Sequence, residues 1–219
     1  MKPCYQICKD RGCPHWSLPL RECSLLPDGC DYAVEHLVSD RGNQVVDGKK
    51  HGVWLYTRDD GTLWYDEIYI TGKLIGYSRE WYENGQLNWE SDEVEGWSEE
   101  FVRGWYQNGE LWYEVHRVDR KLHGFCCWWW DNGQKFYEGK FILGKRTGWW
   151  TSWDEAGELL FEGNYSDGKR EGLWRCRDET GKLMIEGNYV SGDREGHWKS
   201  MDDDGKLLFE EFYVKGEKR

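Results

Sequence analysis

Residues 172–196 read GLWRCRDETGKLMIEGNYVSGDREG, and the pattern of this stretch recurs along the chain at a spacing of 24 residues. One glycine series keeps this register without a break, at positions 61, 85, 109, 133, 157, 181 and 205. An acid follows five residues after each of these glycines: Asp66, Glu90, Glu114, Glu138, Glu162, Glu186 and Glu210. A fixed period of this length indicates a repeat protein, in which each repeat packs mainly on its neighbours.

Each repeat reads as two strands joined by turns. In the quoted stretch, the strand-forming runs Leu173 to Arg177 and Lys182 to Val190 are separated by Asp-Glu-Thr-Gly and followed by Ser-Gly-Asp. Related repeats have Asn-Gly at the first turn, which is the strongest short-range hairpin signal. A turn every ten to fourteen residues leaves no room for ordinary helices. We therefore predict an all-β fold: an elongated single-layer antiparallel β-meander of about seven 24-residue β-hairpin repeats, with a small Cys-rich N-terminal cap.

Strand alternation predicts which side chains share a face. The second, fourth and eighth residues after the turn glycine, such as Leu159, Phe161 and Tyr165, should form a core ladder of Leu and aromatic rings. A Gly at the sixth place, as in Gly163, would leave space for a neighbouring ring. The repeated acids then lie on the other face, where we expect them to accept hydrogen bonds from turn amides or to pair with bases such as Arg170. A catalytic carboxylate row is disfavoured, because it offers only copies of one group.

The tryptophans fall into two sets of opposite parity. One set, including Trp150 and Trp174, lies two residues after a repeat glycine, and the other lies three residues further on. Rings should therefore lie on both faces of the middle of the sheet, and an exposed aromatic patch marks a binding surface. The alternative is that curvature of the sheet or the Cys-rich segment covers these rings. The residues predicted to bind a partner are Trp81, Trp105, Trp129, Trp130, Trp153, Tyr82 and Tyr106.

Residues 1–33 form a Cys- and Pro-rich segment that differs from the repeat array, which we assign to residues 34–219. The segment is too short and polar to bury much apolar surface, so it needs a staple or must pack on the array. A structural zinc ion held by three thiolates and an imidazole is one interpretation, but the spacing matches no zinc-finger signature. Disulfides and free thiols stay open as alternatives. The predicted zinc ligands are Cys4, Cys8, Cys13 and His15, with Cys23 or Cys30 as alternative ligands.

Composition limits the partners. With 41 acids against 29 bases the net charge is −12, which disfavours nucleic acid and anionic membranes and favours a basic protein partner. The apolar runs are far shorter than the roughly 20 residues that a membrane helix needs. No secretory signal is visible at the N-terminus, so we expect a cytoplasmic protein. The sequence shows no nucleophile elbow or phosphate loop, and we expect neither an enzyme nor a cofactor beyond the zinc ion considered above.

The segments EGKFILGKRTGWW, EGNYSDGKREGLW and EGNYVSGDREGHW resemble MORN repeats, and more closely the bacterial MORN-repeat variant often named YwqK-like antitoxins. The resemblance covers about residues 48–219, is strong over 133–216, and weakens over 85–120. It implies an elongated twisted sheet, a protein partner held along its surface, and a role as an antitoxin or immunity protein. The alternatives are a MORN-type scaffold or membrane-associated adaptor and a glycan-binding module.

Overall fold

The computed structural model describes residues 42–92 and 98–219, and these residues form only strands, turns and loops. Their contacts divide the chain into two compact units, residues 1–109 (unit 1) and 110–219 (unit 2). None of the described residues belongs to a helix that could cross a membrane. The expected boundary between residues 33 and 34 lies outside the described residues, as does the Cys-rich cap.

Most strands in both units are six to nine residues long, and β1, β5, β8 and β17 are shorter. The described part of unit 1 contains β1 (Gln44–Val46), β2 (Lys49–Thr57), β3 (Leu63–Ile70), β4 (Lys73–Trp81), β5 (Leu87–Ser91) and β6 (Glu99–Trp105). Unit 2 contains β7 (Leu111–Val118), β8 (Lys121–Leu122), β9 (Gly124–Trp129), β10 (Lys135–Ile142), β11 (Lys145–Trp153), β12 (Leu159–Ser166), β13 (Lys169–Arg177), β14 (Leu183–Val190), β15 (Asp193–Met201), β16 (Leu207–Val214) and β17 (Glu217–Lys218).

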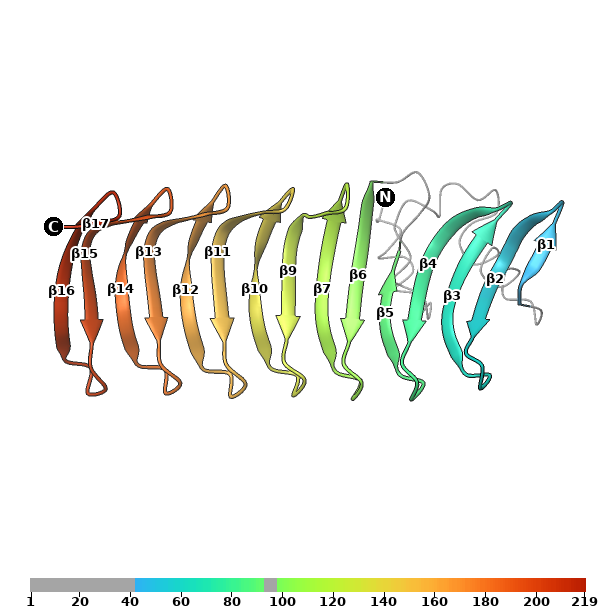
Figure 1. Ribbon diagram of the computed structural model, residues 1–219, viewed down its shortest axis with the longest axis horizontal. Helices are drawn as coiled ribbons and strands as arrows, with labels where there is room; N and C mark the ends of the chain where they lie inside the picture. Colours follow the sequence, from blue (N-terminus) through green and yellow to red (C-terminus); the bar gives the residue numbers. More distant parts are fainter. Residues whose placement is uncertain (1–41, 93–97) are drawn as a thin grey trace, which may run out of the picture. The chain divides into compact units, whose positions relative to one another are not determined.

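Strands that follow one another in the chain pair antiparallel. In unit 1, the pairing runs without a crossover from β1 to β6. In unit 2, β7 pairs with β8 and β9, and the pairing then continues strand by strand to β17. Figure 1 shows the strands of each unit side by side in chain order. The predicted all-β meander of antiparallel hairpins is confirmed within each unit.

Two kinds of turn alternate along the meander. At the longer turn, the Gly181 N–H donates to the Asp178 carbonyl, and the Asp178 N–H donates to the Lys182 carbonyl, both at 3.0 Å. At the shorter turn, Ser191 and Gly192 have φ of 52° and 96°. Two successive residues with positive φ define a type I′ turn, which matches the twist of the strands that it joins. Hairpin turns therefore explain why glycines recur in register.

Arg120 occupies a glycine position of the short turn, and we expect that Arg120→Gly will stabilise unit 2. Asp119 and Arg120 have φ of 49° and 61°, so the arginine adopts the left-handed conformation that glycines take in the sister turns. This conformation costs a residue with a Cβ roughly 1 kcal/mol. Urea unfolding should show a gain of about 0.5–1 kcal/mol for the variant. An unchanged or lower stability would mean that this turn carries no conformational strain.

The buried ring face of unit 2 is built from tryptophans that lie on glycines of the preceding strand. The Trp174 ring lies over Gly163, where an added Cβ would be 2.2 Å from Cδ2. Gly139 and Gly187 have the same relation to Trp150 and Trp198. These three tryptophans are at most 6% exposed. We call this side of unit 2 the ring face, and the predicted space for a ring above the strand glycine is confirmed.

The residues of this interlocking pair change together from repeat to repeat. Each ring-face Trp of unit 2 follows its glycine by eleven residues. In the pairs Glu67 with Ser78, Ser91 with Val102 and Val115 with Cys126, the later residue is smaller and the earlier one carries a side chain. A ring and a Cβ cannot both occupy this space, so each repeat is matched to its neighbour by steric fit.

The prediction that the second and fourth residues after the turn glycine share a face is wrong. Leu159 lies directly opposite Trp153, whereas Phe161 lies opposite Ser152, and the register shifts between the two pairs. A β-bulge inserts one extra residue there, which reverses the side of the strand on which the next residue lies. The same shift occurs in β13–β14 and β15–β16. The leucines therefore lie beside the second tryptophan set, on the face opposite to the ring face.

Candidate functional site

The repeated acids of unit 2 lie on the face opposite to the ring face, which we call the carboxylate face. In unit 2 they alternate with residues of the strands between them and form one continuous row across the sheet. Directly opposed residues on neighbouring strands have their Cβ atoms about 5 Å apart, so their side chains interact. The members of this carboxylate row are Glu114, Cys127, Glu138, Thr151, Glu162, Arg175, Glu186, Lys199 and Glu210.

Arginines in the strands neutralise part of the row. Arg175 lies between two carboxylates, with Nη1 3.8 Å from Glu162 and Nε 3.4 Å from Glu186. Arg177 adds an ion pair to Glu162 at 3.2 Å. In unit 1, Arg79 forms two hydrogen bonds to Asp66, at 2.6 and 3.0 Å. The predicted pairing of the acids with bases of adjacent strands is confirmed for these residues.

The bases that follow the short turns have another role. Arg170 and Arg194 lie over the rings of Trp174 and Trp198, with the guanidinium carbon 4.7 and 4.5 Å from the ring centroid. Each also donates a hydrogen bond to a tyrosine hydroxyl of the next repeat. The prediction that Arg170 pairs with the carboxylates is therefore wrong. Each of these arginines lies two residues before a repeat glycine, and this position places its side chain on the ring face instead.

Two members of the row are neutral where other repeats have a base. Cys127 and Thr151 occupy the position held by Arg79, Arg175 and Lys199 elsewhere. Burial, together with the nearby charge of Glu138, raises the pKa of the Cys127 thiol to about 12, so the thiol stays protonated near neutral pH. Its sulfur lies 3.7 Å from Glu138 Oε2. The middle of unit 2 therefore has more carboxylates than bases within the row.

Exposed apolar side chains lie in the next row of the carboxylate face. Phe125 is 61% exposed and Trp149 is 52% exposed. Phe125 lies opposite Lys140, and Trp149 lies opposite Asn164. Both rings are two residues from the neutral row positions, on the same face of their strands. Large rings that are half exposed beside a charged row are typical of interaction surfaces rather than of a core.

Of the residues predicted to bind a partner, four lie in unit 1 (Trp81, Tyr82, Trp105 and Tyr106) and three in unit 2 (Trp129, Trp130 and Trp153). Trp81, Trp105, Trp129 and Trp153 follow the parity of the carboxylate face, and all four are half-buried. Two of the turn residues have structural roles: the Tyr82 hydroxyl donates to the Trp105 carbonyl at 2.9 Å, and Trp130 Nε1 donates to the Trp153 carbonyl at 3.1 Å. Tyr106, at the sister position, is half-buried as well.

Phe125 and Trp149 were missed as candidates, although a signal for them exists. Each directly follows a repeat glycine and has the same parity along its strand as the tryptophan of the second set, Trp129 or Trp153. If the alternation of side chains had been followed along both strands of each repeat, and not for the tryptophans alone, these rings would have been placed beside the carboxylate row.

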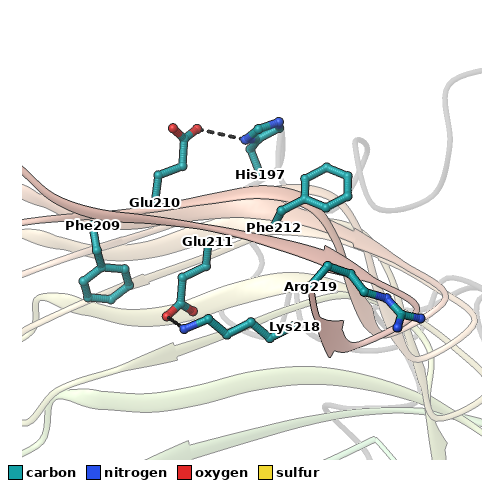
Figure 2. Close-up of a pocket in the computed structure, with 7 residues that line it drawn as sticks. All are labelled: His197, Phe209, Glu210, Glu211, Phe212, Lys218 and Arg219. Carbon is teal, nitrogen blue, oxygen red and sulfur yellow. Dashed lines mark hydrogen bonds and ion pairs between the residues drawn. The ribbon is translucent and has the colours of Figure 1, made fainter.

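Two hollows lie at the margins of unit 2. One, of about 720 Å³, lies at the long turns of unit 2 and is lined by residues including Trp130 and Leu160. Another, of about 390 Å³, lies at β16. Figure 2 shows Glu210 and Phe212 on one side of this strand, and Phe209 and Glu211 on the other. Both hollows are open, so the carboxylate face is a surface rather than a pocket.

The predicted zinc ligands Cys4, Cys8, Cys13 and His15 lie outside the described residues, and zinc binding stays a prediction. Within residues 42–92 and 98–219, no group of three or more His, Cys, Asp or Glu side chains is placed to hold a metal ion.

Stacked antiparallel hairpins with an interlocked ring face define a β-hairpin repeat protein. Residues 170–191 and 194–215 match the family model of the MORN repeat variant, so the predicted resemblance is confirmed over these two repeats. A comparison with curated proteins finds no match. Among solved structures, a mutant of S. aureus TarM in complex with fondaparinux, α-GlcNAc-glycerol and UDP is similar over 55% of this chain, with 12% identity and a TM-score of 0.25. The match spans 19% of that chain.

Proposed function

We propose that this chain is a non-catalytic binding protein, an antitoxin or immunity protein that neutralises a basic protein toxin by holding it on the carboxylate face. The observation that carries the proposal is the pair of half-exposed rings, Phe125 and Trp149, beside the carboxylate row of unit 2. Aromatic residues that protrude beside charged groups supply much of the binding energy at protein interfaces. The MORN-variant repeats support a binding role, and the antitoxin role follows from the resemblance of the sequence.

The charge of the chain supports a basic partner. A net charge of −12 and a row of carboxylates attract a cationic protein and repel nucleic acid. Such complementarity mainly raises the association rate, whereas the exposed rings slow dissociation. The acid that recurs in the row is the same group in every repeat of unit 2, whereas acid–base catalysis needs unlike acids with separated pKa values. We place this action in the cytoplasm.

The test is co-expression with the product of the adjacent gene. We expect that product to arrest growth when it is expressed alone, and this chain to restore growth and to co-purify with it. The association rate should fall by about tenfold between 50 and 300 mM NaCl, because the added salt shortens the Debye length from above to below about 10 Å and screens the exposed charges. A neighbour that is harmless, or whose toxicity persists despite this chain, would refute the antitoxin role.

A further inference from the structure

Three arginines form a row on the ring face of unit 2, close to the short turns. Each is the second residue of its strand, and its guanidinium carbon lies over the tryptophan four residues later, at 5.2, 4.7 and 4.5 Å from the ring centroid. Neighbouring members are one repeat apart, which corresponds to two strands or about 9.6 Å. The members of this arginine row are Arg146, Arg170 and Arg194.

Tyrosine hydroxyls hold the arginine row in place without neutralising it. Nη1 of each member donates to the uncharged hydroxyl of the tyrosine 19 residues later, at 3.1, 2.8 and 3.1 Å. Within residues 42–92 and 98–219, no member of the row forms an ion pair, in contrast to Arg175 and Arg177. Arg170 and Arg194 are exposed and Arg146 is half-buried, so the row presents positive charge at the surface.

The carboxylates closest in sequence and space to the arginine row have other partners. Glu211 is near enough to Arg194 for their charges to interact, but it pairs with Lys218 instead. Glu171 and Glu195 directly follow two of the arginines, and each accepts the backbone N–H of a residue in the next short turn. The arginine row can therefore accept carboxylates from outside the described part of its own unit.

A matching row of carboxylates lies at the opposite margin of unit 2, at the tips of the long turns. Each member is exposed and lies two residues before a turn glycine. Within the described part of the chain, these carboxylates make no hydrogen bond or ion pair, and the Lys182 ammonium contacts the carbonyl of Asp203 rather than its carboxylate. Figure 1 shows the long and short turns of unit 2 at opposite ends of the strands. The members of this turn-acid row are Glu155, Glu179 and Asp203.

The two rows have the same spacing, because both are set by the same repeat. Three cations about 9.6 Å apart can therefore meet three carboxylates of another copy at the same time. A guanidinium and a carboxylate form two parallel hydrogen bonds, and these pairs are stronger than contacts between neutral groups. A guanidinium that is already held on a tryptophan ring also loses less side-chain freedom when it binds. An unrelated acidic protein would need the same spacing by chance, whereas a second copy of this chain has it already.

We propose that the arginine row of one copy binds the turn-acid row of a second copy of this chain, a self-association that goes beyond the proposed binding of a toxin. The two rows lie at different margins, so the contact is heterologous. Each added copy leaves one row of each kind free at the ends of the assembly, and further copies can join. The carboxylate face takes no part in this contact.

The first test is the weight-average mass of the full chain, measured by sedimentation equilibrium in about 100 mM NaCl, where charges more than about 10 Å apart are screened. We expect the mass of one chain at about 10 µM and at least about 1.5 times that mass at about 0.5 mM, since three charged contacts give a dissociation constant of roughly 300 µM. About 1 M NaCl should restore the mass of one chain. A chain that stays monomeric at about 0.5 mM overturns the proposal.

The second test removes one row at a time. The arginine variant carries Arg146→Gln, Arg170→Gln and Arg194→Gln, and the acid variant carries Glu155→Gln, Glu179→Gln and Asp203→Asn. Each variant alone should remain monomeric at about 0.5 mM. An equimolar mixture should form pairs and nothing larger, because only one complementary contact remains. Self-association of either variant to the extent of the parent chain, or a mixture of folded variants that stays monomeric, contradicts the proposal.

The acid variant also gives a result that does not depend on the folding of the arginine variant. It changes only exposed side chains and keeps the arginine row, so it can bind the end of a parent assembly but cannot extend it. Adding it to the parent chain should therefore lower the average mass of the assemblies, and an unchanged average mass would count against the proposal.

A control variant separates the turn-acid row from a general effect of net charge. It carries Asp119→Asn, Asp167→Asn and Asp193→Asn, three exposed acids at or beside the short turns. This variant loses as many negative charges as the acid variant, but the turn-acid row stays intact. It should associate at least as strongly as the parent chain, and loss of association would show that the turn-acid row is not the determinant.

Discussion

Replacing Gly163 with Ala will lower the free energy of unfolding of this protein by about 3 kcal/mol, the upper end of the usual cost of overpacking. The added Cβ would lie 2.2 Å from Cδ2 and 2.3 Å from Cε2 of Trp174, which is far inside contact distance. The ring is 3% exposed, and its Nε1 donates to the Asn164 carbonyl at 3.0 Å, so it has no free space into which to move. Urea unfolding followed by circular dichroism measures the effect.

A double-mutant cycle identifies the cause of this loss. In a Trp174→Ala background the ring is gone, so the additional change Gly163→Ala should cost less than about 0.5 kcal/mol or even stabilise the strand. Ser166→Ala, an exposed position at the end of the same strand, serves as a control and should have little effect. If Gly163→Ala costs the same with and without the ring, steric interlocking is not what matches one repeat to the next.

Replacing Asp66 with Ala will destabilise unit 1 by about 3 kcal/mol, because it leaves Arg79 without its buried carboxylate. The Asp66 side chain is 3% exposed, and its carboxylate accepts two hydrogen bonds from the guanidinium. Losing one member of a buried pair costs more than the net contribution of the pair, since the remaining charge stays poorly solvated. Thermal and urea unfolding of the variant provide the measurement.

The exposed pair of Lys145 and Asp167 is the matched control. It has nearly the same separation, 2.7 Å against 2.6 Å, but its side chains are 60% and 76% exposed. Asp167→Ala should therefore cost no more than about 0.5 kcal/mol. Comparable losses from Asp66→Ala and Asp167→Ala would show that burial does not decide the importance of ion pairs in this sheet.

The hairpin architecture could be predicted from the sequence because both of its signals are local. Asn-Gly and Asp-Gly turns set the length of each strand, and a constant period fixes which strands are neighbours. The space above Gly163 was also predictable, since a glycine between aromatic neighbours in a strand indicates a packed ring. The general expectation that the acids pair with bases of an adjacent hairpin rests on opposite charges that share a face of neighbouring strands, and the pair of Asp66 and Arg79 is one example.

Alternation alone could not predict on which side of the sheet the side chains near the long turns lie. A bulge adds one residue between Leu159 and Phe161, and no residue type marks its position in the sequence. The roles of the turn aromatics were missed for a different reason. Tyr82 and Trp130 reach the carbonyl of a residue 23 positions later, and such a contact depends on the stacking of neighbouring turns. Trp149 is exposed and Trp150 is buried, and this difference depends on which face of the sheet is covered.

The most direct test of whether the carboxylate face is the binding surface is an affinity measurement. It compares how tightly variants with substitutions on one face or the other bind the product of the adjacent gene. The variant with both Phe125→Ala and Trp149→Ala should bind at least about 30-fold more weakly, since each ring is expected to act as an interface anchor. Ile185→Ala removes a 37% exposed side chain from the ring face and should bind like the parent chain. Unchanged binding by the double variant, or a comparable loss from Ile185→Ala, would contradict the account.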